Sequence, residues 1–374
     1  MVRRFLAQID GVVLAALLPI IVAGVLTMNS FAANDYFASR QLIWIGLSLA
    51  VLIGASFVDW RFLRKSSLIA GLFLAGSAVL ILVLVLGRIT HGVQSWLFFG
   101  GVAFQPADFM KLILILVLAK YFSRRHIEIA HIRHILVSGL YAFIPFALIL
   151  IQPDFGSAII IFAIWLGLVM VSGVSKKHLL GVILLGAAAF LLAWSFLFAD
   201  YQKARIVTFL HPLADIQGAG YNAFQSTIAV GSGGWWGKGL GYGTQSRLEF
   251  LPEYQTDFIF AAFAEEWGFA GVVIIFGLYG VIIWRLIKSA MYAATNFESL
   301  FTLGVAIMLG SHFVIHVGMN VGLLPVTGLP LPFMSYGGSH LLAECLALGM
   351  VMGMRRYSLA YHRDDIRNEF IGPQ

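Results

Sequence analysis

Long apolar runs alternate with short polar breaks along most of this chain, and each run is close to the length needed to cross a lipid bilayer. A helix of roughly 20 apolar residues spans the hydrocarbon core. The eighth run is longer, which predicts a helix that is tilted, kinked or extended past the interface. We therefore predict ten membrane-spanning helices, over residues 12–33, 42–58, 67–87, 107–122, 135–151, 157–173, 179–199, 257–287, 301–322 and 338–354.

The composition indicates the same class of protein. Of the 374 residues, 60% are hydrophobic and 11% are charged, and the mean hydropathy is +0.90. A soluble domain carries roughly 25% charged residues. We predict an all-α polytopic membrane protein in which residues 1–374 form a single integral membrane domain. The single cysteine, Cys345, excludes an intrachain disulfide and a cysteine-based metal cluster.

The basic residues predict the orientation of the helices, because Lys and Arg concentrate in cytoplasmic loops. With both termini in the cytoplasm, 17 of the 24 basic residues lie on the cytoplasmic side. The net charge of +6 is then a topology signal and predicts no nucleic-acid partner. Residues 200–256 become a large extracytoplasmic loop between helices seven and eight. The seven basic residues on the outer side are Arg40, Arg88, Lys111, Lys203, Arg205, Lys238 and Arg247.

Asp257 stands where this polar loop meets the apolar eighth helix, in the stretch FLPEYQTDFIFAAFAEEWG. Ionisable groups near hydrocarbon are costly and persist mainly where chemistry or an ion path requires them. The alternative is that Thr256 or Asp257 only caps the helix, after Pro252 has ended the preceding structure. Capping alone does not account for the charged residues that surround this position.

Four other polar breaks face the same side as Asp257 in this topology, so acids and bases collect at one depth. Asp108 and Lys111 are three residues apart on one helix face and are predicted to pair. Charges at the membrane midplane, which a transport path requires, are scarcer. The polar residues of the five breaks are Arg40 and Gln41, Gln105 to Lys111, Gln152 to Asp154, Arg205 with Glu253 and Asp257, and the Pro- and Gly-rich segment Gly322 to Gly338.

Small residues follow Asp257 at helical spacing, at Ala261, Ala264, Gly268 and Gly271. With Asp257 they share one face of the helix, which predicts close approach of another helix; a groove that admits a lipid chain is the alternative. Two carboxylates lie further along the same helix and need partners in the protein interior or in a wet cavity. These are Glu265 and Glu266.

Two local motifs resemble functional sites but lack a required residue, and a third indicates helix packing. The glycine-rich run GSGGWWGKG lacks the first glycine and the Ser or Thr of a phosphate-binding loop. His312 and His316 are four residues apart, but Phe313 stands where a zinc protease has glutamate, so packing between helices is favoured over metal binding. Gly349 and Gly353 form a GxxxG pattern, which predicts close helix packing.

The segment from Gly218 to Gly268, together with QPADFMK, QPDFG and GLPLPFMSYGGS, resembles the SEDS family (shape, elongation, division and sporulation) over essentially the whole chain. The segments GSGG and GTQSRLEFLPE are more similar in sequence to the elongation members of the family than to its division members. The resemblance implies a ten-helix protein of the bacterial cytoplasmic membrane with an outward-facing active site. It implies a glycosyltransferase that polymerises peptidoglycan glycan strands from lipid II, an undecaprenyl-pyrophosphate-linked disaccharide peptide, together with a class B penicillin-binding protein.

The resemblance also implies roles for individual residues. Asp257 matches the proposed catalytic acid of the family, and Arg40, Lys111 and Arg205 match basic positions at its outer cavity. Two positions depart from the family pattern: Asp108 replaces a glutamate, and Ser95 precedes Trp96 where arginine is frequent. The shorter Asp108 can still reach Lys111, whereas one phosphate contact is missing at Ser95.

This chemistry suits the residues themselves. A base near the acceptor hydroxyl removes its proton as the glycosidic bond forms, and Asp257 is the candidate. The pyrophosphate leaving group requires positive charge, for which the basic candidates are suited. A divalent cation is an alternative source of that charge, but no motif identifies a metal site or a cofactor. The predicted substrate-binding residues are Arg40, Lys111, Arg205, Lys238, Asp154 and Glu253.

Two other functions fit ten spans with interfacial charges. A flippase would move the lipid-linked precursor across the membrane, but the chain shows no inverted repeat and its polar signals lie on one side. A scaffold would recruit the wall machinery and tolerate loss of the Asp257 charge. Membrane lipids contact the apolar helix faces in every case.

Overall fold

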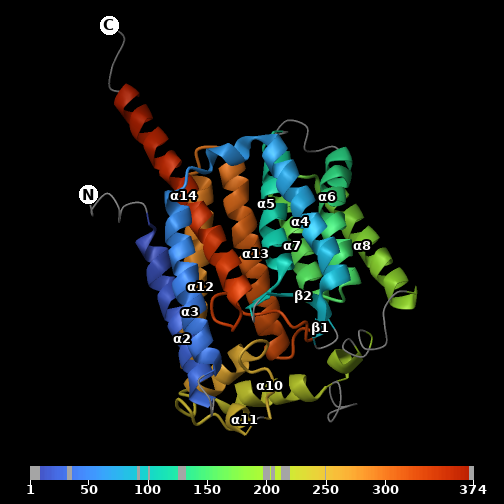
Figure 1. Cartoon of the computed structure of the whole chain (residues 1–374), viewed down its shortest axis with the longest axis vertical. Coiled ribbons are helices and arrows are strands. Elements are labelled where there is room, and N and C mark those ends of the chain that lie inside the picture. The colour runs from blue at the N-terminus through green and yellow to red at the C-terminus, as the bar shows by residue number, and fades with distance from the viewer. Residues whose placement is uncertain are drawn as a thin grey trace.

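The computed structural model describes residues 9–31, 36–90, 93–99, 102–124, 132–196, 203, 207–211, 220–248 and 250–369. Each predicted span overlaps a long helix of the bundle (Figure 1). These helices are α2 (Gly11–Phe31), α3 (Tyr36–Phe57), α4 (Ser66–Leu86), α5 (Pro106–Ser123), α6 (Ile132–Ile151), α7 (Phe155–Val171), α8 (Lys176–Phe196), α12 (Ile259–Met291), α13 (Asn296–Asn320) and α14 (Gly338–Glu369).

Within the described residues, six of the helices are long and apolar enough to cross a membrane, judged by length and composition. They are α2, α3, α4, α6, α12 and α13. Large apolar side chains on the outside of the bundle are exposed, such as Leu74 at 68% and Val85 at 74% on α4. Such surfaces are costly in water and suit lipid. The fold is therefore that of a mostly helical, multi-pass membrane protein.

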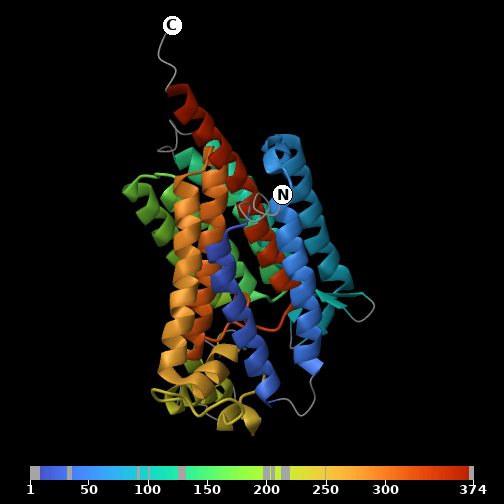
Figure 2. The same cartoon turned by 90° about the vertical axis from the view of Figure 1, so that its left-hand side faces the viewer.

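The helices α5, α7 and α13 pack against one another and form the interior of the bundle. α5 packs against α4, α7 and α13, and most of its side chains are buried. Figure 1 shows α5, α7 and α13 near the middle of the bundle, and Figure 2 shows α2 and α3 on the face turned toward the viewer. The GxxxG pattern packs as predicted, because a Cβ on Gly349 would lie 2.5 Å from the carbonyl oxygen of Leu52 on α3. Only glycine allows α14 to approach α3 this closely.

The interior helices begin at local signals that the sequence carries. Pro106 occupies the first turn of α5, where its missing N–H costs nothing. The Asp154 carboxylate caps α7 by accepting a hydrogen bond of 2.9 Å from the Ser157 amide. Both helices therefore start at defined residues beside the polar breaks that precede them.

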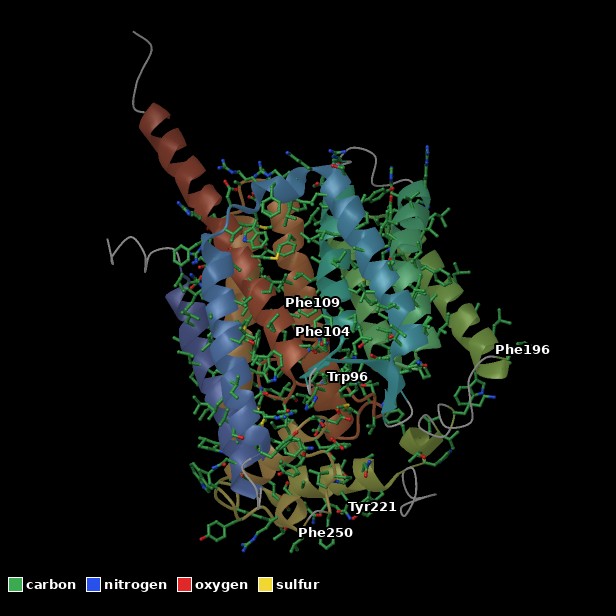
Figure 3. All side chains as sticks on the ribbon, in the orientation of Figure 1. Trp96, Phe104, Phe109, Phe196, Tyr221 and Phe250 are labelled. Atoms are coloured by element: carbon green, nitrogen blue, oxygen red, sulfur yellow. The ribbon has the colours of Figure 1, made fainter. Side chains whose placement is uncertain are left out.

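The prediction of an all-helical chain is wrong between α4 and α5. Three short strands, β1 (Arg88–Thr90), β2 (Val93–Phe99) and β3 (Val102–Phe104), form an antiparallel sheet there. Its aromatic-rich sequence suits a pleated surface. The Phe104 ring of β3 stacks on Phe109 of α5 with centroids 5.1 Å apart (Figure 3). The sheet thus joins the end of α4 to the start of α5.

The segment predicted as a large loop, residues 200–256, contains helices in its described part. This segment contains α10 (Tyr221–Ser232) and α11 (Thr244–Arg247), which lie together at one end of the bundle (Figure 1). Tyr221 and Phe250 mark the same end in Figure 3. The 3₁₀ helix η1 (Trp60–Arg64) lies at the opposite end, where Asp10 binds Arg285 at 2.6 Å and also binds Arg355.

The eighth predicted span, now α12, has a kink at Gly268, where φ is 64° and ψ is −168°. The amides of Phe269 and Ala270 donate to the carbonyls of Gly234 and Trp235 at 2.8 and 3.1 Å, outside their own helix. The prediction that small residues from Asp257 to Gly271 share one helix face is therefore wrong, because the kink at Gly268 interrupts the helix between Ala264 and Gly271. Tertiary hydrogen bonds to the α10–α11 connection replace the helical ones at this point.

Candidate functional site

Asp257 lies in a tight turn immediately before α12. Glu253 adopts a left-handed conformation, with φ of 53°, that few non-glycine residues adopt. Its carbonyl accepts from the Asp257 amide at 3.1 Å, and its carboxylate accepts from the Thr256 hydroxyl at 3.1 Å. The N-cap position of α12 is Phe258, so Asp257 precedes the cap.

A buried asparagine at the end of α13 fixes this turn. The Asn320 side chain donates to the Asp257 carbonyl at 3.0 Å and accepts from the Ala261 amide at 3.2 Å. The Ala261 amide belongs to the first turn of α12, where backbone amides lack helical partners. Asn320 therefore caps α12 from a neighbouring helix, a role that its position at the end of an apolar run did not reveal.

The connection between α13 and α14 wraps around the same turn. Its Ser335 hydroxyl donates to the Thr256 carbonyl at 2.7 Å, and its Tyr336 amide donates to the Gln255 carbonyl at 2.8 Å. Gly328 has φ of 71°, and a Cβ placed there would lie 3.4 Å from Asp257 Oδ2. The half-buried Asp257 carboxylate is thus bordered by this Pro- and Gly-rich connection.

Arg40 lies beside the same connection. It occupies the first turns of α3, is exposed, and stacks its guanidinium 4.7 Å from the Tyr36 ring centroid. The neighbouring Phe37 ring contacts the Tyr336 ring, with centroids 5.1 Å apart. Burial and the nearby Tyr36 raise the pKa of Tyr336, whereas Arg40 opposes this rise. Tyr336 therefore links Arg40 to the turn that carries Asp257.

Lys238 and the two glutamates of α12 form a separate cluster. The buried Glu265 carboxylate accepts from Lys238 Nζ at 2.7 Å and from the Thr244 amide at 2.9 Å. Glu266 accepts from the Gly241 amide at 2.7 Å. The predicted need of both glutamates for partners in the protein is thus met by the α10–α11 connection. Lys238 remains 28% exposed.

The predicted pair of Asp108 and Lys111 is present deep in the bundle. Lys111 Nζ lies 3.1 Å from Asp108 Oδ1, so the shorter acid does reach its partner. Lys111 Nζ also lies 3.3 Å from His312 Nε2, and its side chain is only 2% exposed. Lys111 therefore faces protein groups in this structure.

Asp154 also has protein partners, since it caps α7 and accepts a hydrogen bond from the side-chain Nε2 of Gln105 at 2.8 Å. Ser95 is buried in β2. Arg205 lies outside the described residues. Within the part of the chain that the structure describes, no group of three His, Cys, Asp or Glu side chains is placed to hold a metal ion.

The site that results is a half-buried carboxylate on a hydrogen-bonded turn, with an exposed guanidinium beside the connection that braces it. It lies where α13 ends, close to the end of the bundle that carries α10 and α11. The class defined by fold and site is a multi-pass helical membrane protein with a polar site near one end of its bundle.

The chain belongs to the FtsW/RodA/SpoVE family of cell cycle proteins, whose model matches residues 4–359. It is 37% identical to stage V sporulation protein E of Bacillus subtilis over 334 residues, covering 88% of this chain and 89% of that one. It is 35% identical to peptidoglycan glycosyltransferase MrdB of Escherichia coli over 352 residues, covering 94% of each chain.

Solved structures also resemble the fold of this chain. A chain from work described as "Structural coordination of polymerization and crosslinking by a peptidoglycan synthase complex" superposes with a TM-score of 0.80 at 32% identity, covering 92% of this chain and 97% of that one. The crystal structure of the rod shape determining protein RodA of Thermus thermophilus gives a TM-score of 0.70 at 31% identity, covering 92% and 95%.

Proposed function

We propose that this chain is a peptidoglycan glycosyltransferase that polymerises lipid II into glycan strands during cell elongation. Relatives named as peptidoglycan glycosyltransferases match nearly its whole length, which supports the reaction class. The observation that carries the assignment of the site is Asp257, whose backbone is hydrogen-bonded to Glu253 and Asn320 while its half-buried carboxylate lies beside Gly328 in the connection between α13 and α14.

In this reaction the acceptor hydroxyl attacks the anomeric carbon of the donor sugar, and the lipid pyrophosphate leaves. Asp257 acts as the general base that takes the hydroxyl proton. Arg40, which is exposed and lies beside Tyr336 of the connection that braces this turn, stabilises the negative charge that develops on the pyrophosphate. Glu253 holds the Asp257 turn, and the reaction requires no cofactor of the protein. A chelator added to the assay tests whether a divalent cation shares the charge stabilisation.

The direct test is the conversion of purified lipid II into glycan strands by the purified chain, alone and with its partner. Polymer formation supports the proposal. Movement of lipid II across vesicle membranes without polymer would indicate a flippase, and neither activity in a complex that still recruits wall enzymes would indicate a scaffold.

We propose ten spans in the bacterial cytoplasmic membrane, with both termini inside and Asp257 facing outward. Cysteine substitutions at the two ends of the bundle test this orientation. Tyr242→Cys, in the exposed α10–α11 connection, should react with a membrane-impermeant thiol reagent in intact cells, and Ser67→Cys should react only after lysis. The buried Cys345 makes the wild type the unlabelled control. Labelling of position 67 alone in intact cells would show that the orientation in the membrane is the reverse of the one proposed.

We expect a class B penicillin-binding protein as the partner, with a single transmembrane helix that docks on one or two helices of this bundle. Apolar helix faces accept such a helix without a strong sequence mark. Affinity purification of the chain in mild detergent should recover this protein, as identified by mass spectrometry. Its absence across several detergents, with the chain itself monodisperse, would count against a stable complex.

A further inference from the structure

Four ionisable side chains form a continuous chain of contacts inside the bundle, away from Asp257. Lys111 and Asp108 come from α5, and His340 and Glu344 come from α14. All four are at least nine-tenths buried, with exposed fractions of 2%, 3%, 6% and 2% in that order. We call this group the buried tetrad. Only its first pair was anticipated from the sequence.

His340 occupies the centre of the buried tetrad. Its Nδ1 lies 3.2 Å from Asp108 Oδ1, and its Nε2 lies 2.9 Å from Glu344 Oε1. A neutral imidazole carries one N–H and would turn a lone pair toward one of the two carboxylates. The doubly protonated imidazolium donates a hydrogen bond to Asp108 from Nδ1 and places its positive charge beside the Glu344 carboxylate at Nε2, where the contact is an ion pair without the angles of a hydrogen bond. The geometry therefore points to a charged His340.

Charge balance leads to the same protonation state. With His340 charged, the buried tetrad contains two cations and two anions and is neutral overall. A neutral His340 would leave one buried negative charge uncompensated, which is strongly destabilising. The neighbouring His312 adds no charge, because its Nδ1 lies 2.9 Å from the Met308 carbonyl, which requires an N–H there, and its Nε2 lies 3.3 Å from Lys111 Nζ.

The buried tetrad is connected to the Asp257 turn. Glu344 Oε2 accepts from the amide of Phe333, a residue with φ of 61° that needs support from its surroundings. Two residues further on, the Ser335 hydroxyl accepts from the Leu331 amide at 2.8 Å and donates to the Thr256 carbonyl at 2.7 Å. The next residue is Asp257.

We propose that His340 is a positioning residue for glycan synthesis: as an imidazolium held between Asp108 and Glu344, it fixes Glu344 beneath the turn at residues 331–335 and thereby holds the backbone that carries Asp257. This inference rests on the proposed function for its kinetic consequence, but the charged state of His340 does not depend on it.

The charged state is measured directly by solid-state NMR of ¹⁵N-histidine-labelled protein in lipid at pH 7.5. We expect an imidazolium signal that is missing from the spectrum of His340→Gln. The matched control, His312→Gln, should lose a neutral imidazole signal instead. If His340→Gln does not fold, the double variant His340→Gln/Glu344→Gln, whose interior stays neutral, provides the assignment. Loss of a neutral signal with His340 would overturn the inference.

The positioning role is measured by a double-mutant cycle. His340→Gln leaves an unpaired buried anion, Glu344→Gln leaves an unpaired cation, and the double variant restores neutrality. We expect each single variant to lower kcat for glycan synthesis on the order of 10- to 100-fold, with KM for lipid II nearly unchanged, because Asp257 is displaced. The double variant should regain most of the loss.

Additive losses in the cycle, or a raised KM with kcat preserved, would overturn the positioning role. Wild-type protein that forms no glycan strands, alone or with its partner, would refute the proposed function instead, while the NMR result for His340 would stand. The two failures are therefore distinguishable.

Discussion

Asp257→Asn should abolish most glycan synthesis while leaving the protein folded. The substitution keeps the size of the side chain and removes only its negative charge and basicity. The contacts with Asn320 and Glu253 are made by the Asp257 backbone, so they survive. Loss of a general base lowers the rate by a factor on the order of 10²–10⁴. Asp257→Glu should retain part of the activity, because a carboxylate displaced by about 1 Å costs on the order of 100-fold.

The measurement is the rate of lipid II polymerisation at matched monodisperse yield. The control is Asp59→Asn, which makes the same chemical change at a carboxylate that is 50% exposed at the other end of the bundle. That variant should polymerise lipid II at the wild-type rate. Equal rates for Asp257→Asn and wild type would remove Asp257 from the mechanism.

Gly268→Ala should prevent the kink of α12 and strongly reduce the yield of folded protein. The φ and ψ values of Gly268 lie in a region that is essentially restricted to glycine, so strain alone costs on the order of 1–3 kcal/mol. In addition, the new Cβ would lie 2.2 Å from the Gly237 amide nitrogen and 2.8 Å from the Trp236 backbone. The α10–α11 connection would have to move, and with it the partners of Glu265.

Gly277→Ala is the matched control, because it lies on the same helix and no atom comes within 4 Å of a Cβ built there. Monodisperse yield and the apparent melting temperature in detergent compare the two variants. We expect Gly277→Ala to equal or exceed the wild type in both, since alanine favours helix. A Gly268→Ala protein as stable as the control would show that the kink is not required for the fold.

Much of the site could be anticipated from single residues. Asp257 was identified because a carboxylate at the edge of an apolar helix is costly, and that cost is visible in the sequence. The pairing of Asp108 with Lys111 followed from a spacing of three residues. The same energetic argument predicted that Glu265 and Glu266 have partners in the protein. It did not predict that these partners include the backbone amides of Thr244 and Gly241.

Other parts of the site depend on contacts between residues far apart in the chain. Asn320 and Ser335 hold the Asp257 turn across 63 and 79 residues of sequence. In the sequence, His340 is a single polar residue in an apolar segment. In the structure it lies between Asp108 of α5 and Glu344 of α14. Lys111 and Lys238 were expected to face the substrate, whereas the structure gives each a carboxylate partner.

By itself, the sequence determined the membrane class, the helical segments and Asp257 as a candidate for the site. These features follow from hydropathy over about 20 residues and from the cost of a charge near hydrocarbon, both of which are local. Only the tertiary structure decided the sheet before α5, the kink at Gly268 and the buried tetrad. At the kink and in the buried tetrad, backbone amides and buried charges find their partners in distant segments, and satisfying them overrides the preference of the local sequence. The strands of the sheet instead pair with their neighbours along the chain.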